Sequence, residues 1–227
     1  MKRATLLIRG APQAALVVTL MFALLFLTAG SIHFWQGWVF LAIFTLCTLA
    51  ISADLLIRDP ALFERRMRGG PLSESRPIQR IIQAVAAVVW FGIIALAGFD
   101  HRYGWSRLPA VVVITADAIF VAAFLGIALV LRANSFAGAT IGIASDQRLV
   151  STGPYAWVRH PMYTGAILMI AAMGFALGSA WAALLTVPLA GVVVVRIRDE
   201  EELLTAELRG YAGYRAAVKW RLVPGIW

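Results

Sequence analysis

The sequence predicts an all-α fold, a polytopic membrane bundle of about six crossing segments followed by a cytoplasmic helix. Hydrophobic residues make up 61% of the 227 residues and charged residues only 14%. Soluble domains carry roughly 45–50% apolar and about 25% charged residues. The apolar residues also gather in six segments, and the basic residues flank these segments. A soluble protein is therefore excluded.

The first four apolar segments are long enough to cross a bilayer, because a hydrocarbon core of ~30 Å needs ~20 residues. They are 11–31, 38–57, 81–99 and 109–131. The first follows Lys2, Arg3 and Arg9 as a secretory signal would. It exceeds the ~7–15 apolar residues of a signal core, so we expect a retained helix.

The last two apolar segments, 162–178 and 180–195, are shorter. About 16 residues rise only ~24 Å as a helix. We therefore predict a tight helical hairpin that turns at Gly178-Ser179, with Trp181 anchoring its tip at the interface. Pro188 is expected to kink the returning arm.

Two polar segments complete the chain. Residues 58–80 are basic and contain Gly69-Gly70-Pro71, which indicates a short surface helix and a linker. Residues 196–218 are predicted to form a cytoplasmic helix, since Arg196, Glu200, Leu204 and Leu208 recur at a spacing of four. We divide the chain into an N-terminal hairpin with its linker (1–80) and a core (81–227).

The basic residues predict the orientation. Of the 20 Lys and Arg residues, all except Arg102 and Arg107 fall on one side if both termini are cytoplasmic. The net charge of +8 suits anionic lipid headgroups better than nucleic acid, which we do not expect as a partner. Cys47 is the single cysteine, so a disulfide and a thiolate metal site are excluded, and no metal is expected.

A charged loop enters an apolar helix at Arg159-His160-Pro161-Met162-Tyr163-Thr164-Gly165. Pro161 fits the first helical position. The following backbone N–H groups would lack intrahelical partners and favour a carboxylate or phosphate. Gly165, one turn further on, would let a ligand or a neighbouring helix approach. A plain helix entry with interfacial aromatic residues is the alternative.

The acidic run Glu200-Glu201-Glu202 is predicted on the same cytoplasmic side. We expect Glu200 and Glu201 on an exposed helix, where they could accept hydrogen bonds from ribose hydroxyls or an amino group. The alternative is a solvated face, with Glu200 paired to Arg196 at a spacing of four.

Two further polar residues belong to the fourth apolar segment or follow it directly. Asp117 lies inside the segment, where an ionisable group is costly and usually faces the bundle interior. It could pair with a basic residue or stay protonated, and we expect it to bind substrate or join helices. Asn134 follows the segment and would cap the helix or bind a ligand.

Together these motifs resemble the isoprenylcysteine carboxyl methyltransferase family, within the membrane methyltransferases that include phospholipid methyltransferases. The resemblance covers roughly residues 132–227. The family often has Phe-Gly and two tyrosines after the acidic pair, where this chain reads Glu207-Leu208-Arg209-Gly210-Tyr211-Ala212-Gly213-Tyr214. The residues that carry the resemblance are Gly153-Pro154-Tyr155, Arg159 to Gly165, Glu200-Glu201 and Arg221 to Trp227.

The resemblance implies an S-adenosylmethionine-dependent methyltransferase of a bacterial inner membrane. It implies a lipophilic acceptor that enters from the bilayer and is methylated on a carboxylate, thiol or amine. Arg159 or Arg196 would suit a carboxylate acceptor, and we expect them to be the catalytic residues. The residues implied to hold the cofactor are Tyr155, His160, Pro161, Tyr163, Gly165, Glu200 and Glu201.

Two other functions stay open from the sequence. Membrane sterol reductases resemble this architecture, so the basic loops could hold a nicotinamide cofactor. A non-enzymatic transport or assembly protein could use Asp117 as an ion site.

Overall fold

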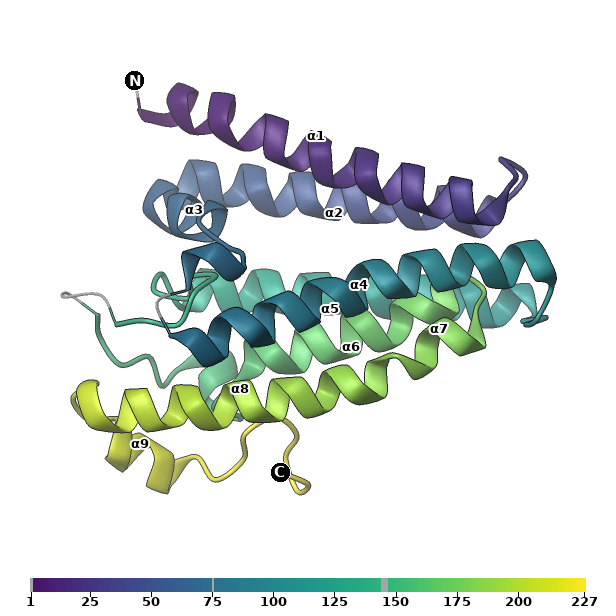
Figure 1. Cartoon of the computed structure of the whole chain (residues 1–227). Helices are drawn as coiled ribbons and strands as arrows, with labels where there is room; N and C mark the ends of the chain where they lie inside the picture. The colour runs from purple at the N-terminus through teal and green to yellow at the C-terminus, as the bar shows by residue number, and fades with distance from the viewer. Residues whose placement is uncertain (1, 75, 144–146) are drawn as a thin grey trace.

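The computed structural model describes residues 2–74, 76–143 and 147–227, and every element in these ranges is helical. In these ranges, five helices are long and apolar enough to cross a membrane if residues 180–207 are counted as one, and α6 is a shorter apolar helix. The predicted class, an all-α polytopic bundle, is therefore confirmed. The long helices lie side by side in Figure 1, with the connecting turns at two opposite ends of the bundle.

The N-terminal part contains two long helices and a short one. Helix α1 (Lys2–Ala29) turns through Gly30, and α2 (Trp35–Arg58) returns beside it. Helix α3 (Pro60–Met67) is amphipathic and starts at Asp59, whose side chain accepts a hydrogen bond from the Leu62 N–H at 2.9 Å. The 3₁₀ turn η1 (Pro71–Ser73) follows Gly70. The short surface helix and linker predicted for 58–80 are thus confirmed.

The core begins with α4 (Pro77–Tyr103) and α5 (Ala110–Ala133), joined at the end of the bundle opposite α3. After α5, an irregular segment and the 3₁₀ turn η2 (Gly153–Ala156) lead to α6 (Pro161–Ala176). Apolar side chains of α1, α2, α4, α5, α6 and α8 pack into one central cluster. The membrane-facing helices therefore share a single core.

The predicted hairpin turns where expected, at Gly178 with φ +74° and at Ser179, which caps α7 (Ala180–Leu184). The returning arm breaks before α8 (Thr186–Glu207), so that Pro188 lies in the first turn of the new helix. Proline is tolerated there because the first-turn N–H groups have no intrahelical acceptor.

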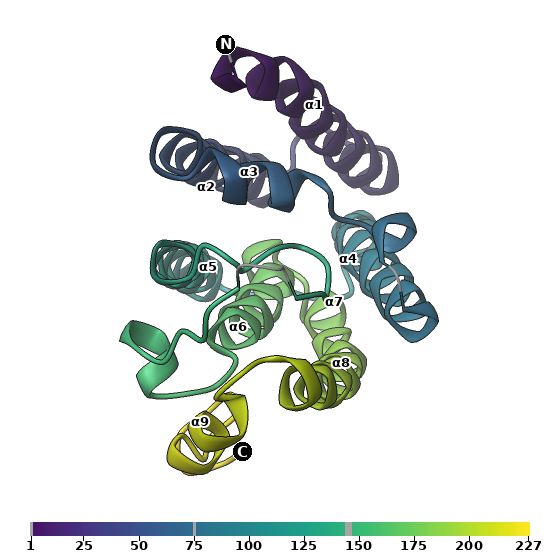
Figure 2. The same ribbon diagram turned by 90° about the vertical axis from the view of Figure 1, so that its left-hand side faces the viewer.

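The boundary expected near residue 196 was wrong. Helix α8 runs without a break from apolar residues through the acidic run to Glu207. It ends before Gly210, which has φ +86° and precedes α9 (Tyr211–Ala217). Figure 2 views the end of the bundle at which α3, the segment after α5 and α9 lie.

Candidate functional site

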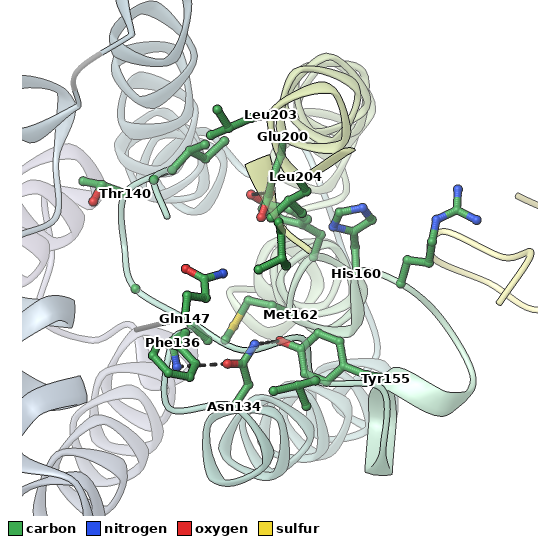
Figure 3. A pocket seen from close by; sticks show the side chains of 18 of the residues that line it. Asn134, Phe136, Thr140, Gln147, Tyr155, His160, Met162, Glu200, Leu203 and Leu204 are labelled. Atoms are coloured by element: carbon green, nitrogen blue, oxygen red, sulfur yellow. Dashed lines mark hydrogen bonds between the residues drawn. The ribbon is translucent and has the colours of Figure 1, made fainter. Parts of the chain in front are cut away.

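A cavity of about 360 Å³ opens at this end of the bundle. Its floor is apolar and consists of Ile127, Met162, Ala166 and Met169. Its walls carry both polar and apolar side chains, and Figure 3 shows them converging from the segment after α5, from the start of α6 and from α8. The residues of these walls that bear on the chemistry are Arg66, Asn134, Tyr155, Arg159, His160, Tyr163, Arg196, Glu200, Tyr211 and Tyr214.

The start of α6 is held by the C-terminal tail. The N–H groups of Arg159 and His160 donate to the carbonyls of Trp220 and Arg221, both at 2.9 Å. The tail closes on itself, because the N–H of Arg221 donates to the Trp227 carbonyl at 2.8 Å. The closing motif therefore fixes the His-Pro loop beside the cavity.

Glu201 is the centre of this arrangement. Its carboxylate accepts hydrogen bonds from Arg159 Nε at 2.6 Å and from Arg221 Nε at 2.9 Å, and it lies 3.2 Å from His160 Nε2. Only 3% of Glu201 is exposed, so the expectation of an exposed residue was wrong. The buried carboxylate joins α8 to the His-Pro loop and the tail.

Glu200 points to the cavity instead. It accepts a hydrogen bond from the Tyr163 hydroxyl at 2.6 Å, and Tyr163 in turn accepts one from Arg196 Nε at 2.8 Å. The ion pair between Glu200 and Arg196, offered as an alternative, is not found among the described residues. The Glu200 carboxylate is therefore still able to accept hydrogen bonds from a ligand.

Arg196 is bound by two residues that the sequence did not point to. Glu74 accepts from its guanidinium at 3.1 Å and Gln79 at 2.7 Å, and both side chains are fully buried. Glu74 also accepts from the Ile141 N–H at 3.1 Å. The linker thus positions Arg196 and the segment after α5. A single glutamate in a polar linker gives no signal of such a role.

Tyr155 and Asn134 form a second polar pair on the cavity wall. Asn134 donates to the Tyr155 hydroxyl at 3.0 Å and accepts from the Phe136 N–H at 2.9 Å. Burial raises the pKa of Tyr155, so its phenol stays neutral near pH 7. Asn134 therefore both stabilises the turn after α5 and orients Tyr155.

Tyr211 is a cavity residue that we did not assign from the sequence. Its hydroxyl is buried and has no hydrogen-bond partner in the part of the chain that the structure describes. Burial also raises the pKa of Tyr211, which keeps the phenol protonated as a donor. Its place among the tyrosines after the acidic pair was the available signal. A buried polar group without a partner is costly, which points to a ligand.

Four predicted site residues do not line the cavity, and the buried Glu201 described above is one of them. Pro161 is buried at the start of α6. Gly165 faces α5, where a Cβ atom would lie 2.7 Å from Ile127 Cγ1, so the glycine allows close packing of α5 and α6. Asp117 lies ~25 Å along α5 from Asn134. The ion pair that was one alternative for Asp117 is not found among the described residues, and its Oδ1 has no partner there.

The cavity thus opens at one end of a bundle of membrane-spanning helices and is lined by both polar and apolar side chains. Residues 111–211 match the model of the phospholipid methyltransferase family. This family lies within the superfamily of membrane methyltransferases that the sequence motifs resemble, so that recognition is confirmed. The match includes α5, α6 and α8 and most of the residues that line the cavity, but not Arg66 and Tyr214. No curated protein matches the chain.

Proposed function

We propose that the protein is an S-adenosylmethionine-dependent methyltransferase that acts on a lipophilic acceptor at the membrane–cytoplasm interface. One observation carries the proposal. The cavity lies largely within the segment that matches the methyltransferase family, and it joins an apolar floor to walls with unused hydrogen-bonding groups. An enzyme with one water-soluble and one membrane-soluble reactant needs this combination.

The residues fit the cofactor. The unpaired Tyr211 hydroxyl is a donor for a carboxylate or a ring nitrogen. Glu200, which makes no ion pair among the described residues, suits the ribose hydroxyls or the amino group. His160 and Tyr155 complete the polar walls. Pro161, Gly165 and Glu201 would then contribute indirectly, by shaping the start of α6.

The apolar floor suits the acceptor. Ile127, Met162 and Met169 line the cavity and also belong to, or pack against, an apolar cluster with Leu62 and Phe63 of α3. An acyl or prenyl chain that enters from the bilayer would stay out of water there, whereas exposure to water would cost ~0.8 kcal/mol per CH₂. Its reactive head would then face the polar walls.

When bound, the cofactor supplies an electrophilic methyl group on a sulfonium. The protein then holds the acceptor atom in line with that methyl group, and such alignment can contribute ~7–11 kcal/mol. A carboxylate or thiolate acceptor needs no base. For an amine acceptor, His160 or Glu200 would accept the proton, because both line the cavity.

Arg159 and Arg196 are better described as positioning residues than as the catalytic pair expected from the sequence. Arg159 is committed to Glu201 and to the carbonyls of Val218 and Lys219, both at 2.8 Å. Arg196 orients the Tyr163 hydroxyl toward Glu200. Both guanidinium groups thus stabilise the walls.

Incubation of the purified protein with a bacterial lipid extract and methyl-labelled S-adenosylmethionine tests this proposal. We expect label in the lipid fraction, and much less of it with Glu200→Gln, which lacks the proposed cofactor carboxylate. Glu202→Gln is the matched control, because Glu202 is an exposed neighbour on the same helix. Transfer that is unaffected by Glu200→Gln would contradict the assigned site.

A further inference from the structure

The cavity contains four arginines, and they differ in their partners. Arg159 is paired with Glu201 at 2.6 Å and Arg196 with Glu74 at 3.1 Å. Arg148 is exposed. Arg66, on α3, is partly buried and has no ion pair among the described residues. Arg66 is therefore the partly buried cation of the cavity that remains available to an anion.

The hydrogen bonds of Arg66 leave most of its guanidinium unused. Its NH1 group donates to the carbonyl of Gly138 at 3.3 Å and reaches that of Ala137 at 3.5 Å. Both are long contacts from a single nitrogen, and a guanidinium has five N–H donors. Burial lowers the pKa of Arg66, but an arginine stays charged at any physiological pH. Partial burial of a charge that has no ion pair among the described residues is costly, and an anionic ligand would reduce that cost.

The position of Arg66 relates it to the acceptor. Its neighbours Phe63 and Met67 on α3 belong to, or pack against, the apolar cluster that also includes Ile127. Ile127 in turn forms part of the cavity floor. Figure 2 shows α3 on one side of α6, and α8 and α9 on the other, where Glu200 and Tyr211 lie. Arg66 thus lies between the apolar cluster and the polar residues of the cavity. This is the place that the charged headgroup of an amphiphile would occupy.

We propose that Arg66 binds an anionic group, a phosphate or a carboxylate, in the headgroup of the lipophilic acceptor and so selects anionic amphiphiles. This inference rests on the proposed function, since it assigns the acceptor end of the same cavity. A guanidinium suits either anion, because its planar fork matches both in bidentate geometry. Arg66 lies outside residues 111–211, so the part of the chain before the family match contributes to substrate choice.

The test compares two amphiphiles with the same chain, dodecyl phosphate and dodecanol, as stabilisers of the purified protein in uncharged detergent. Ligand that binds only the folded protein raises the midpoint of thermal unfolding. We expect dodecyl phosphate to stabilise the wild type more than dodecanol does. The Arg66→Gln variant should bind dodecyl phosphate about 10- to 150-fold more weakly, the loss expected for one charged hydrogen-bonding partner.

Arg65→Gln is the matched control. Arg65 also lies on α3, but it donates to the Ser135 carbonyl, stacks near Phe136 and does not line the cavity. The Arg65→Gln variant should therefore keep the wild-type preference for dodecyl phosphate over dodecanol. Equal stabilisation of the wild type by both amphiphiles would overturn the proposal, even if Arg66→Gln did not fold. An unchanged preference in a folded Arg66→Gln variant would also overturn it.

Titration of the same variants with S-adenosylhomocysteine separates this inference from the proposed function. We expect Arg66→Gln to bind it as the wild type does. A selective loss of that binding would assign Arg66 to the cofactor and overturn the inference. A third outcome is that neither the wild type nor a variant binds S-adenosylhomocysteine, while the preference for dodecyl phosphate over dodecanol still depends on Arg66. The proposed function then fails, but the anion site stands.

Discussion

At the scale of the residue, the unpaired Tyr211 hydroxyl makes a distinctive prediction. Tyr211→Phe removes a buried polar atom that has no partner among the described residues, so thermal stability without ligand should be unchanged or higher. Affinity for S-adenosylhomocysteine should fall about 5-fold, the usual effect of one neutral hydrogen bond of ~1 kcal/mol. Calorimetry and thermal unfolding measure the two effects.

Tyr214→Phe provides the contrast. Tyr214 also lines the cavity, but its hydroxyl already donates to the Tyr155 carbonyl at 2.8 Å. Its loss should lower stability in the absence of ligand, because the carbonyl loses its donor. If Tyr211→Phe destabilised the free protein as much as Tyr214→Phe does, the Tyr211 hydroxyl would have a structural partner and no ligand role.

Substitution of the adjacent residues Glu201 and Glu202 should have very different effects on stability. Glu201→Ala leaves Arg159 buried without its carboxylate, so we expect a loss of about 3–5 kcal/mol of stability. Glu202→Ala changes an exposed residue and should stay within about 0.5 kcal/mol. Denaturation in detergent compares the two. Equal effects on the unfolding midpoint would show that the Glu201 network does not hold the tail to α8.

At the scale of the element, a glycine determines how closely the final hairpin can pack. A Cβ atom at Gly174 would lie 2.5 Å from the Ala183 Cα, which is backbone and cannot move aside cheaply. We expect Gly174→Ala to separate α6 from α7 and to lower thermal stability markedly. Gly191→Ala is the control, since nothing lies within 4 Å of the position of its added Cβ. Similar midpoints for both variants would contradict the close packing.

Much of the arrangement of elements follows from local sequence. Helix ends follow from the lengths of the apolar segments, from the break at Gly69-Gly70 and from the turn at Gly178. Each of these signals depends only on residues close together in the sequence. The continuation of α8 past residue 196 did not follow from local sequence. Helical periodicity continues from the apolar arm into residues 196–207, and no local signal marks where a membrane surface would cut it. The boundary at residue 196 was drawn from polarity, which does not end a helix.

The candidate site was predictable only in part. His160 and Tyr163 of the His-Pro motif, Tyr155 and Glu200 belong to recognisable patterns and do line the cavity. The contacts of Glu74 with Arg196, and of the tail with the His-Pro loop, join residues more than 50 positions apart. Such pairings depend on how the helices pack, so a single sequence does not reveal them.

At the scale of the whole molecule, the bundle places the segments rich in basic residues at one end. The start of α1, α3 and α9 lie there, and the turn between α1 and α2 lies at the other (Figure 1). We propose that the former end faces the cytoplasm, with both termini and the cavity. The division of the chain at residue 80 stays a prediction, although α1 and α4 share the central core.

Labelling of single cysteines tests this orientation. In a Cys47→Ser background, Leu72→Cys lies in η1 at a position that is 96% exposed, and Ile32→Cys lies in the opposite turn at one that is 65% exposed. In intact cells, an impermeant maleimide should label the Ile32 position only, and Leu72 should react after the membrane is opened. The reverse pattern would place the cavity outside the cytoplasm.

The central claim is that this cavity binds S-adenosylmethionine. Isothermal titration of the purified protein with S-adenosylhomocysteine, the product of methyl transfer, tests it most directly. The account predicts saturable binding at one site per chain, weakened about 10- to 150-fold by Glu200→Gln because a charged hydrogen-bonding partner is lost. NADPH should give no such binding. Saturable binding of NADPH without any binding of S-adenosylhomocysteine would contradict the claim and favour a reductase.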